Sequence, residues 1–402
     1  MDLFEKFTAG LNDPISALSR EIHGVGTFPK LTGDIGNYMH HRGRRLLVWS
    51  LNNYLGLANH PQVRRADAES AARWGLAAPM GSRMMSGETE ELEALEAELA
   101  EYSRKPAALF LNYGYQGMVS LIDALAGRHD WVVYDAESHA CIIDGVRIQR
   151  GRARPFPHND IDRLDAVLAR IEAQRAVDEG VLVVTEGVFG MSGEQGRVAD
   201  IVALKEKYDF RLLVDDAHGF GVLGPDGGGT GEEQGVQDGI DLYFGTFAKA
   251  GASIGAFIAS EPEVIWGLRY SMRSQIFAKS TPWPIVAGNR VRLRLLRTCP
   301  ELRKQAWTVA ELLQSSLRDS GFEIGNPASL VTPVYLRMTP AEGNEFVRVL
   351  REEHGVFCSV VTYPVVPEGI VQLRLISTAA HDTADVEPTV EAIRRTFADV
   401  AG

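Results

Sequence analysis

Two stretches of the sequence decide the fold: RLLVDDAHGFG at Arg211–Gly221 and YFGTFAKAGAS at Tyr243–Ser253. Each begins with an apolar run typical of a β-strand and ends in charged residues, glycine and a reactive side chain. The first run leads to Asp215 and His218, and the second leads to Lys249. In an open α/β sheet, ligands bind beyond the carboxyl ends of the strands. We therefore expect these three side chains to belong to one binding site.

A lysine and a buried carboxylate at one edge of a sheet suit pyridoxal phosphate. Lys249 would form an imine with it, and Asp215 would keep its pyridine nitrogen protonated so that the ring accepts electrons. Other interpretations exist for each motif alone. The Asp-Asp-x-His run could hold a metal or satisfy a loop, and a single lysine in a Gly/Ala-rich turn is usually solvated. The combination, order and separation of the two motifs favour the cofactor, and we expect no metal.

Composition narrows the class of protein. With 402 residues the chain exceeds one comfortable core, and 45% hydrophobic and 23% charged residues are typical of a soluble globular protein. The net charge of −12 argues against nucleic acid as the main partner. It also provides no general attraction for an anionic substrate, so a CoA nucleotide would need a local basic patch.

The cysteines and the apolar runs indicate a location. Cys141, Cys299 and Cys358 lack metal-binding spacing and leave one cysteine unpaired, which fits a reducing compartment. No apolar run reaches ~18 residues, and the first ten residues lack the basic-then-apolar pattern of a signal peptide. We therefore expect a cytoplasmic protein, with peripheral contact to the inner face of the membrane as an open alternative.

Strand-like runs alternate with helical segments through most of the chain. This alternation predicts an α/β fold with a mainly parallel sheet and helices on both faces. Near residue 285 the pattern becomes helical, and a small α+β region follows with strand candidates TPVYLRM, VFCSVV and VQLRLIS. We expect an N-terminal segment at 1–60, a large domain at 61–290 and a small C-terminal domain at 291–402. The runs in the large domain are 107–111, 131–134, 181–185, 211–214, 242–245 and 254–259.

Seven motifs together give the chain a family resemblance. NNYLGL, GSRMMSG, SHACIIDG, TEGVFGMSG, VDDAHGFGVLG, GTFAKA and QLRLISTAAH occur in the order seen in the α-oxoamine synthases, which are fold-type I pyridoxal phosphate enzymes. The chain resembles this family over nearly its whole length. The resemblance implies condensation of an amino acid with an acyl-CoA, with release of CO2 and CoA. MRSQIFAKS and PMGSRMMSG are most similar to the segments of bacterial serine palmitoyltransferases.

The resemblance assigns roles around the cofactor ring. It makes Lys249 the lysine that carries the cofactor, and the same amine, once displaced, would remove the α-proton of the amino acid. It places Asp215 on the pyridine nitrogen and His218 on the phenolic oxygen. His139 in SHACIIDG corresponds to the imidazole stacked on the ring, although such a histidine could also be a helix cap or a core residue. Glu186 in TEGVFG corresponds to a carboxylate near the cofactor.

The phosphate of the cofactor needs backbone donors and hydroxyl groups. Gly114 and Tyr115 follow the strand AALFL and open a helix, whose N–H groups suit a dianion, although an ordinary strand–helix turn would look the same. Thr246 would place its hydroxyl on the same phosphate. Lys279 stands where the family has a hydroxyl residue that contacts phosphate across a dimer interface. We expect a homodimer with shared active sites, in which Lys279 reaches the partner's phosphate.

Substrate contacts are also implied by the resemblance. Arg374 in QLRLIS corresponds to the arginine that binds the carboxylate of the amino acid, and Asn52 in NNYLGL corresponds to an active-site asparagine. We expect His381, in the motif TAAHD, to have a structural role and not a catalytic one. The chain departs from the family pattern at Leu92, where many relatives have histidine, at Gly190, where many have serine, and at Ala278–Lys279, where many have Ser-Thr.

The sequence therefore predicts a cytoplasmic, homodimeric acyltransferase that condenses L-serine with a long-chain acyl-CoA, such as palmitoyl-CoA, to give 3-ketosphinganine. The alternatives within the family are 8-amino-7-oxononanoate synthase, 2-amino-3-ketobutyrate CoA ligase and 5-aminolevulinate synthase. A non-catalytic partner subunit is disfavoured by the intact Lys249, Asp215 and His218. A nicotinamide-binding domain is disfavoured because no G-x-G-x-x-G turn follows the first strand.

Overall fold

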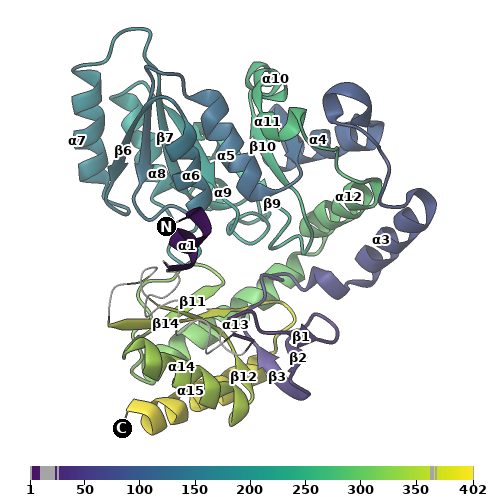
Figure 1. Ribbon diagram of the computed structural model, residues 1–402, viewed down its shortest axis with the longest axis vertical. Coiled ribbons are helices and arrows are strands. Elements are labelled where there is room, and N and C mark those ends of the chain that lie inside the picture. Colours follow the sequence, from purple (N-terminus) through teal and green to yellow (C-terminus); the bar gives the residue numbers. More distant parts are fainter. Residues whose placement is uncertain (1, 10–22, 25–26, 363–365, 367–368, 402) are drawn as a thin grey trace. The chain divides into compact units, whose positions relative to one another are not determined.

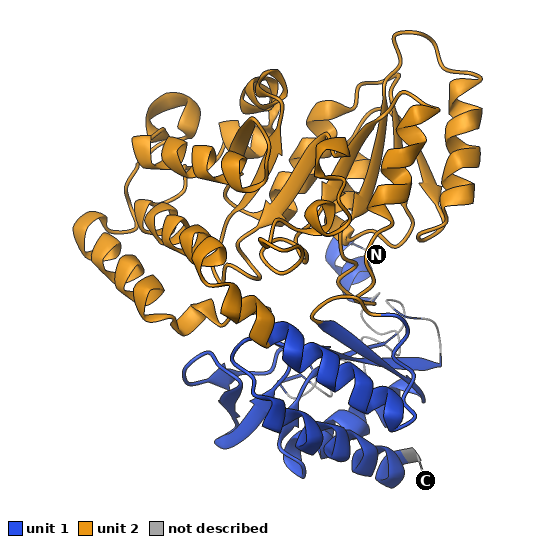
Figure 2. Ribbon diagram, turned by 180° about the vertical axis from the view of Figure 1, so that it is seen from behind, with its two compact units in different colours: residues 1–51, 306–326, 331–402 blue, residues 52–305, 327–330 orange. Residues whose placement is uncertain are grey.

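The computed structural model describes residues 2–9, 23–24, 27–362, 366 and 369–401. Contacts between Cα atoms divide the chain into two units (Figure 2). The large unit comprises residues 52–305 and 327–330, and the small unit comprises residues 1–51, 306–326 and 331–402. This division differs from the expected boundaries at residues 60 and 290. The N-terminal residues group with the C-terminal ones because β3 (Arg44–Val48) pairs in parallel with β12 (Val356–Phe357).

The large unit is built on a seven-stranded sheet with the order β4-β10-β9-β8-β7-β5-β6 (Figure 1). The strands from β9 to β6 are parallel, and β10 runs antiparallel to both of its neighbours. This confirms the predicted α/β fold with a mainly parallel sheet. The bounds are β4 Ala107–Leu111, β5 Trp131–Asp135, β6 Arg152–Phe156, β7 Val181–Glu186, β8 Arg211–Asp215, β9 Leu242–Thr246 and β10 Ala256–Ser260.

The sheet is buried on both faces, which explains its continuous apolar runs. Leu213 and Phe244 belong to one face and pack with apolar residues of α5, α6 and α10. Tyr243 and Phe257 lie on the other face, where the ring of Phe257 contacts that of Phe220 with 5.1 Å between centroids. The side chains at the strand ends therefore extend from a sheet whose two faces are both covered by apolar residues.

Helices connect the strands of the large unit (Figure 1). In α4 the spacing of Leu92, Leu95 and Leu99 gives the helix one buried face, and the hydroxyl of Thr89 caps the helix by accepting the Leu92 N–H. The bounds are α3 Pro61–Trp74, α4 Glu90–Tyr102, α5 Gly114–Leu125, α6 Ala140–Ile148, α7 Ile161–Glu172, α8 Val198–Ala203, α9 Thr230–Glu233, α10 Pro262–Ser271, α11 Arg273–Ile276, α12 Trp283–Thr298 and α13 Pro300–Asp319, whose last part belongs to the small unit.

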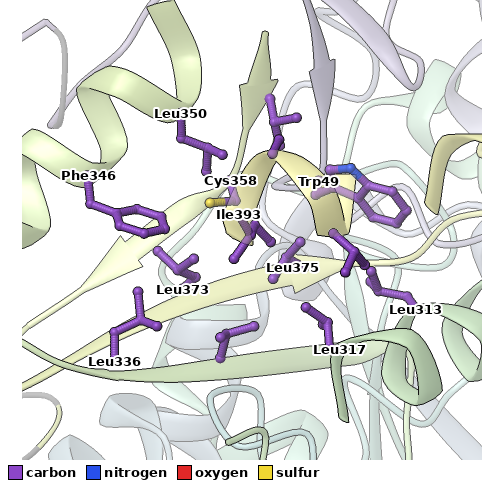
Figure 3. Packing of buried hydrophobic residues seen from close by; sticks show 14 of the residues in the cluster. Trp49, Leu313, Leu317, Leu336, Phe346, Leu350, Cys358, Leu373, Leu375 and Ile393 are labelled. Carbon is purple, nitrogen blue, oxygen red and sulfur yellow. The ribbon is translucent and has the colours of Figure 1, made fainter. Parts of the chain in front are cut away.

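The described residues of the small unit form two sheets, with orders β1-β2-β3-β12 and β11-β14-β13. The predicted strand VFCSVV is in fact two short strands that join different sheets. The core includes Trp49, Leu313, Phe346, Leu373 and Ile393 (Figure 3). The bounds are α1 Leu3–Ala9, β1 Leu31–Thr32, β2 Tyr38–His41, β11 Val331–Arg337, α14 Pro340–Glu352, β13 Ser359–Val361, β14 Ile370–Ile376 and α15 Val386–Ala401. Across the described parts of both units, no helix has the length and apolar character needed to span a membrane.

Candidate active site

Asp215 and Lys249 lie beyond the ends of two neighbouring strands. Asp215 closes β8 with only 5% of its surface exposed, and its Oδ1 accepts the Ala217 N–H at 3.1 Å. Lys249 is half-buried in the turn that follows β9. Burial raises the pKa of Asp215, and the positive charge of Lys249 acts in the opposite direction. The charge of Lys249 therefore acts on Asp215, as expected if both belong to one site in the large unit.

A second buried carboxylate lies directly beside Asp215. Glu186 ends β7 and pairs in register with Asp215 on β8. Burial raises the pKa of Glu186 well above its usual range, and the negative charge of Asp215 raises it further. Two adjacent carboxylates in a dry site do not both ionise readily. Lys249 lowers the pKa of both carboxyl groups, but it is the largest influence opposing burial only at Asp215, so we assign the negative charge to Asp215 and the proton to Glu186.

His139 caps the start of α6, next to this pair. Its backbone N–H donates to Glu186, and its Nδ1 accepts the Cys141 N–H at 3.3 Å. Burial lowers the pKa of His139, which favours a neutral ring. An Nδ1 that accepts leaves the proton on Nε2. The thiol of Cys141 lies 3.0 Å from His139 Nδ1 and 3.8 Å from Asp215 Oδ2, so it bridges the histidine and the carboxylate.

His218 lies in the turn after β8. Its Nδ1 is 2.6 Å from the hydroxyl of Tyr54, and both residues are buried. On the other edge of the ring, a β-carbon at Gly190 would lie 2.3 Å from His218 Nε2. The absence of a side chain at residue 190, a departure from the family pattern, thus makes room for the imidazole. Sequence reasoning missed Tyr54, although it lies within the quoted motif NNYLGL.

The predicted phosphate residues come together at the start of α5. Gly114 is the first residue of this helix and Tyr115 the second. A β-carbon at Gly114 would lie 3.6 Å from Thr246 Oγ1, so the helix terminus and the hydroxyl are adjacent. The Thr246 hydroxyl accepts the Ala248 N–H at 3.1 Å, and Tyr115 donates its own hydroxyl to Asp144. A helix N-terminus next to a hydroxyl is a suitable cradle for a dianion.

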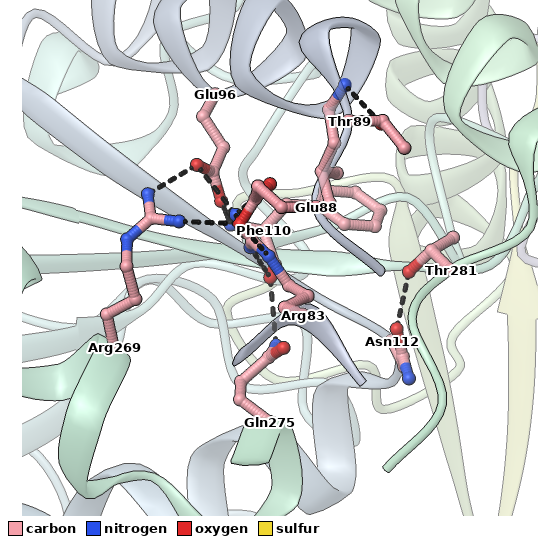
Figure 4. Close-up of polar contacts among 10 residues, drawn as sticks. Arg83, Glu88, Thr89, Glu96, Phe110, Asn112, Arg269, Gln275 and Thr281 are labelled. Atoms are coloured by element: carbon pink, nitrogen blue, oxygen red, sulfur yellow. Dashed lines mark hydrogen bonds and ion pairs between the residues drawn. The ribbon is translucent and has the colours of Figure 1, made fainter. Parts of the chain in front are cut away.

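Lys279 is exposed, and its Nζ lies 3.4 Å from the carbonyl oxygen of Leu76. Its backbone carbonyl accepts the side-chain N–H of Asn112 at 2.8 Å, and Thr281 donates to the same asparagine (Figure 4). The loop around Lys279 is therefore tied to the residue two positions before α5. Its contact with a partner's phosphate stays a prediction.

Two predicted substrate residues occupy separate units. Asn52 is exposed at the start of the large unit, and Arg374 is half-buried on β14 of the small unit, opposite Pro333 and Ser359. Their contacts with the amino acid remain predictions. His381 stacks on Trp49 with 4.0 Å between ring centroids, which gives it a packing role in the small unit.

The motif GSRMMSG contributes a buried ionic network that sequence reasoning missed (Figure 4). Arg83 donates to Glu96 at 2.6 Å and to Glu88 at 2.9 Å, and Arg269 of α10 donates to Glu96 at 2.7 Å. Glu96 also accepts the N–H of Phe110 at 2.7 Å. The network therefore anchors the end of β4, which leads directly into the start of α5. The network therefore supports the start of α5, where the phosphate is predicted to bind, but none of its residues is predicted to contact the phosphate.

In the described ranges, the histidine, cysteine and acidic side chains form no group of three or more that could hold a metal ion. The side chains gathered at this edge of the sheet are a lysine, two buried carboxylates and two histidines. Their chemistry is that of a carbonyl-binding amine beside a buried anion.

Known proteins are similar to this chain over most of its length. Residues 44–393 match the family described as aminotransferase class I and II. The chain belongs to this family, and within it to the α-oxoamine synthases. It is 51% identical to a cysteate-C-fatty acyltransferase from Capnocytophaga ochracea, over 97% of this chain and 93% of the relative. It is 38% identical to an 8-amino-7-oxononanoate synthase from Geobacter sulfurreducens, over 91% and 92% of the two chains.

The α-oxoamine synthase fold is also seen in solved relatives. A serine palmitoyltransferase from S. paucimobilis with bound pyridoxal phosphate and myriocin superimposes with a TM-score of 0.90 and 28% identity, covering all of both chains. One from Sphingomonas wittichii gives a TM-score of 0.90 and 29% identity over 100% of this chain and 99% of the other. In sequence, the serine palmitoyltransferase of Sphingobacterium spiritivorum is 33% identical over 88% and 87% of the two chains.

Pyridoxal phosphate is the cofactor of this α-oxoamine synthase. The residues of the large unit fit it chemically. A buried carboxylate and a lysine lie together, and the start of α5 places backbone N–H groups beside the Thr246 hydroxyl, which suits a phosphate.

Proposed function

We propose that this PLP-dependent C-acyltransferase joins a fatty acyl group, taken from a thioester such as palmitoyl-CoA, to the α-carbon of cysteate, with loss of the cysteate carboxylate as CO2. The observation that carries the proposal is the 51% identity to a cysteate-C-fatty acyltransferase over 97% of the chain. The identity to the serine palmitoyltransferase of Sphingobacterium spiritivorum is 33%.

L-Serine, the amino acid predicted from the sequence, is the second candidate. It is supported by the TM-score of 0.90 to solved serine palmitoyltransferases over the whole chain. Cysteate and serine differ at one position, where a sulfonate replaces a hydroxyl. The reaction at the α-carbon is the same for both, so the catalytic residues do not discriminate between them.

The proposed catalytic residues divide the work at the ring. When bound, pyridoxal phosphate supplies an electron sink that stabilises negative charge on the α-carbon. Lys249 holds the cofactor and then, as a neutral amine, takes the α-proton. Asp215 holds a proton on the pyridine nitrogen through a charge-assisted hydrogen bond. Because Glu186 carries its own proton, it adds no second negative charge at this edge.

The remaining proposed roles concern orientation. With the cofactor bound, His139 would lie against its ring and would donate from Nε2–H to the substrate carboxylate, while His218 would donate to the phenolic oxygen. Phosphate is held by the N–H groups at Gly114 and Tyr115 and by the hydroxyl of Thr246. Arg374 and Asn52 bind the amino acid. A bidentate guanidinium fixes a carboxylate in one plane, which orients the bond to be broken.

We further propose a homodimer. Two segments of the large unit lie side by side, because Ser280 N–H donates to Gly81 O at 2.8 Å and Trp283 N–H donates to Ala78 O at 3.0 Å. They expose an unusual number of large apolar side chains, which indicates an interaction surface. Lys279 belongs to the same surface and is proposed to reach the partner's phosphate. The exposed residues are Leu76, Met80, Met84, Met85 and Phe277.

An equilibrium titration tests the amino-acid preference. The holoenzyme is titrated with cysteate, serine, glycine and alanine, and the visible absorption of the cofactor reports binding. We expect cysteate to saturate the spectral change at the lowest concentration. Saturation by serine at a lower concentration than cysteate would favour the second candidate, and a response to glycine or alanine alone would contradict both.

A further inference from the structure

We propose that Tyr54 is a positioning residue that sets the tautomer of His218. In this arrangement the phenol O–H of Tyr54 donates to Nδ1, and the imidazole carries its proton on Nε2. The inference deepens the proposed function, because it rests on His218 as the donor to the phenolic oxygen of the cofactor.

The contact itself is short and shielded from solvent. The Tyr54 hydroxyl and His218 Nδ1 are 2.6 Å apart, and the exposed fractions of the two residues are 1% and 8%. A hydrogen bond between buried groups is electrostatically stronger than the same bond in water. A neutral imidazole has one donor and one acceptor nitrogen. If Nδ1 accepts from the phenol, Nε2 must be the nitrogen that carries the proton.

The backbone fixes the position of the phenol. Tyr54 lies within a tight turn in which Gly56 N–H donates to Asn53 O at 2.9 Å. The side chain of Asn53 closes the turn further, since its Oδ1 accepts the Ala58 N–H at 3.1 Å. Gly56 has a φ of 68°, which favours glycine at this corner. The hydroxyl is therefore held in place before any ligand binds.

The turn that carries His218 is equally fixed. Phe220 N–H donates to Asp216 O at 2.8 Å. The carboxylate of Asp216 is buried and accepts the hydroxyls of Thr230 at 2.7 Å and Tyr243 at 2.9 Å. Asp216, the second aspartate of the DDAH motif, thus holds the turn in place through its side-chain and backbone hydrogen bonds.

Gly190 defines the opposite edge of the imidazole. A β-carbon at residue 190 would lie 2.3 Å from Nε2 and 3.0 Å from Cε1 of His218. The imidazole therefore lies between the phenol of Tyr54 at Nδ1 and the backbone of Gly190 at its Nε2 edge.

The chemistry requires this tautomer. The phenolic oxygen of the bound cofactor carries negative charge and accepts hydrogen bonds, so a useful histidine must present N–H to it. A neutral imidazole with the proton on Nδ1 would present a lone pair instead and would repel the oxygen. Tyr54 excludes that state by occupying Nδ1 as a donor.

The test is ¹⁵N NMR of the holoenzyme labelled at histidine, with the His218 signals assigned through His218→Asn. We expect Nδ1 of His218 to have a pyridine-type shift and Nε2 a pyrrole-type shift with a bound proton. Tyr54→Phe should give a mixture of tautomers, a shifted pH profile of the visible cofactor band, and kcat lowered about tenfold. Tyr102→Phe removes another buried phenol hydroxyl, which donates to Gly227 O at 3.0 Å, and should leave the His218 shifts unchanged.

The wild-type spectrum decides the proposal even if Tyr54→Phe does not fold. A proton on Nδ1, or on both nitrogens, would overturn it, as would unchanged His218 shifts in a folded Tyr54→Phe protein. The proposed function fails separately. If neither cysteate nor serine is acylated while His218 shows the expected tautomer, the substrate assignment is wrong and the positioning role stands.

Discussion

Glu186 and Asp215 face each other in register at the carboxyl ends of neighbouring parallel strands, so two buried carboxylates share one edge of the sheet. Burial raises the pKa of each, and their mutual repulsion raises that of Glu186 further. Two adjacent buried carboxylates do not both ionise readily, and Lys249 is the largest influence opposing burial at Asp215, to which we therefore assign the charge. This asymmetry gives two chemically similar residues different roles.

Replacing Asp215 and Glu186 separately should expose that difference. Asp215→Asn should retain cofactor but lower kcat by at least about a hundredfold, because a neutral amide cannot hold the pyridine nitrogen protonated. Glu186→Gln should lower kcat far less, since the amide resembles a carboxyl group that is already neutral. Steady-state kinetics and bound-cofactor absorbance measure both. Equal losses in the two variants would show that the charge is not localised on Asp215.

Lys249→Ala should abolish acyl transfer while leaving the fold intact. In the proposed mechanism the amine both holds the cofactor and moves the α-proton, so its removal would delete both functions. Borohydride reduction of the wild-type protein, followed by peptide mapping, should find the cofactor on Lys249. Attachment to any other lysine would remove this residue from its assigned role.

Lys279→Ala should weaken cofactor retention and shift the oligomer toward monomer at low protein concentration. The predicted reason is loss of an ammonium contact to the partner's phosphate. Dialysis against buffer without cofactor, followed by sedimentation analysis, measures both effects. Lys207→Ala, a change of an exposed lysine that pairs with Asp165, is the control. Unchanged retention and assembly would leave Lys279 as an ordinary surface residue.

Stability should fall at alkaline pH through His158. Burial alone would lower its pKa, but hydrogen bonds to Asp135 and Glu194 outweigh burial and raise the pKa to about 9. A folded-state pKa above the unfolded value of about 6.5 stabilises fully below pH 6.5, and that contribution is lost as pH rises through 9. Urea unfolding should lose on the order of 2 kcal/mol between pH 7 and 9.5. His158→Gln should flatten this dependence, with His129→Gln as an exposed control. The same slope in His158→Gln would contradict the assignment.

Much of the large unit could be predicted because its strands are indicated by short, continuous runs of apolar residues. Continuous apolar runs such as VLVVT must be buried on both faces, which fixes a parallel strand without any knowledge of its partners. The strand RARPF was missed because it lies at the sheet edge, where its exposed positions break the apolar run. VFCSVV was predicted as one strand, since nothing in its sequence shows that its two halves pair with different sheets.

In the candidate site, too, some residues could be predicted from the sequence and others could not. Lys249, Asp215 and Thr246 could be placed together because each follows directly from the end of a strand. Tyr54 could not, because its contact with His218 spans 164 residues and depends on the turn at Asn53. The ionic network of Arg83 was also missed, since burial of an arginine is decided by Glu88 and Glu96 rather than by its neighbours in sequence.

The most direct test of the account is the ratio of kcat/KM for cysteate and serine, measured on purified holoenzyme with palmitoyl-CoA and with pimeloyl-, acetyl- and succinyl-CoA. The products are identified by mass spectrometry, and CO2 release is followed in parallel. The account predicts one CO2 for each C-acylated product, a long-chain acyl donor over the three short ones, and a higher kcat/KM for cysteate than for serine. A higher kcat/KM for serine than for cysteate, or a preference for a short acyl donor, would contradict it.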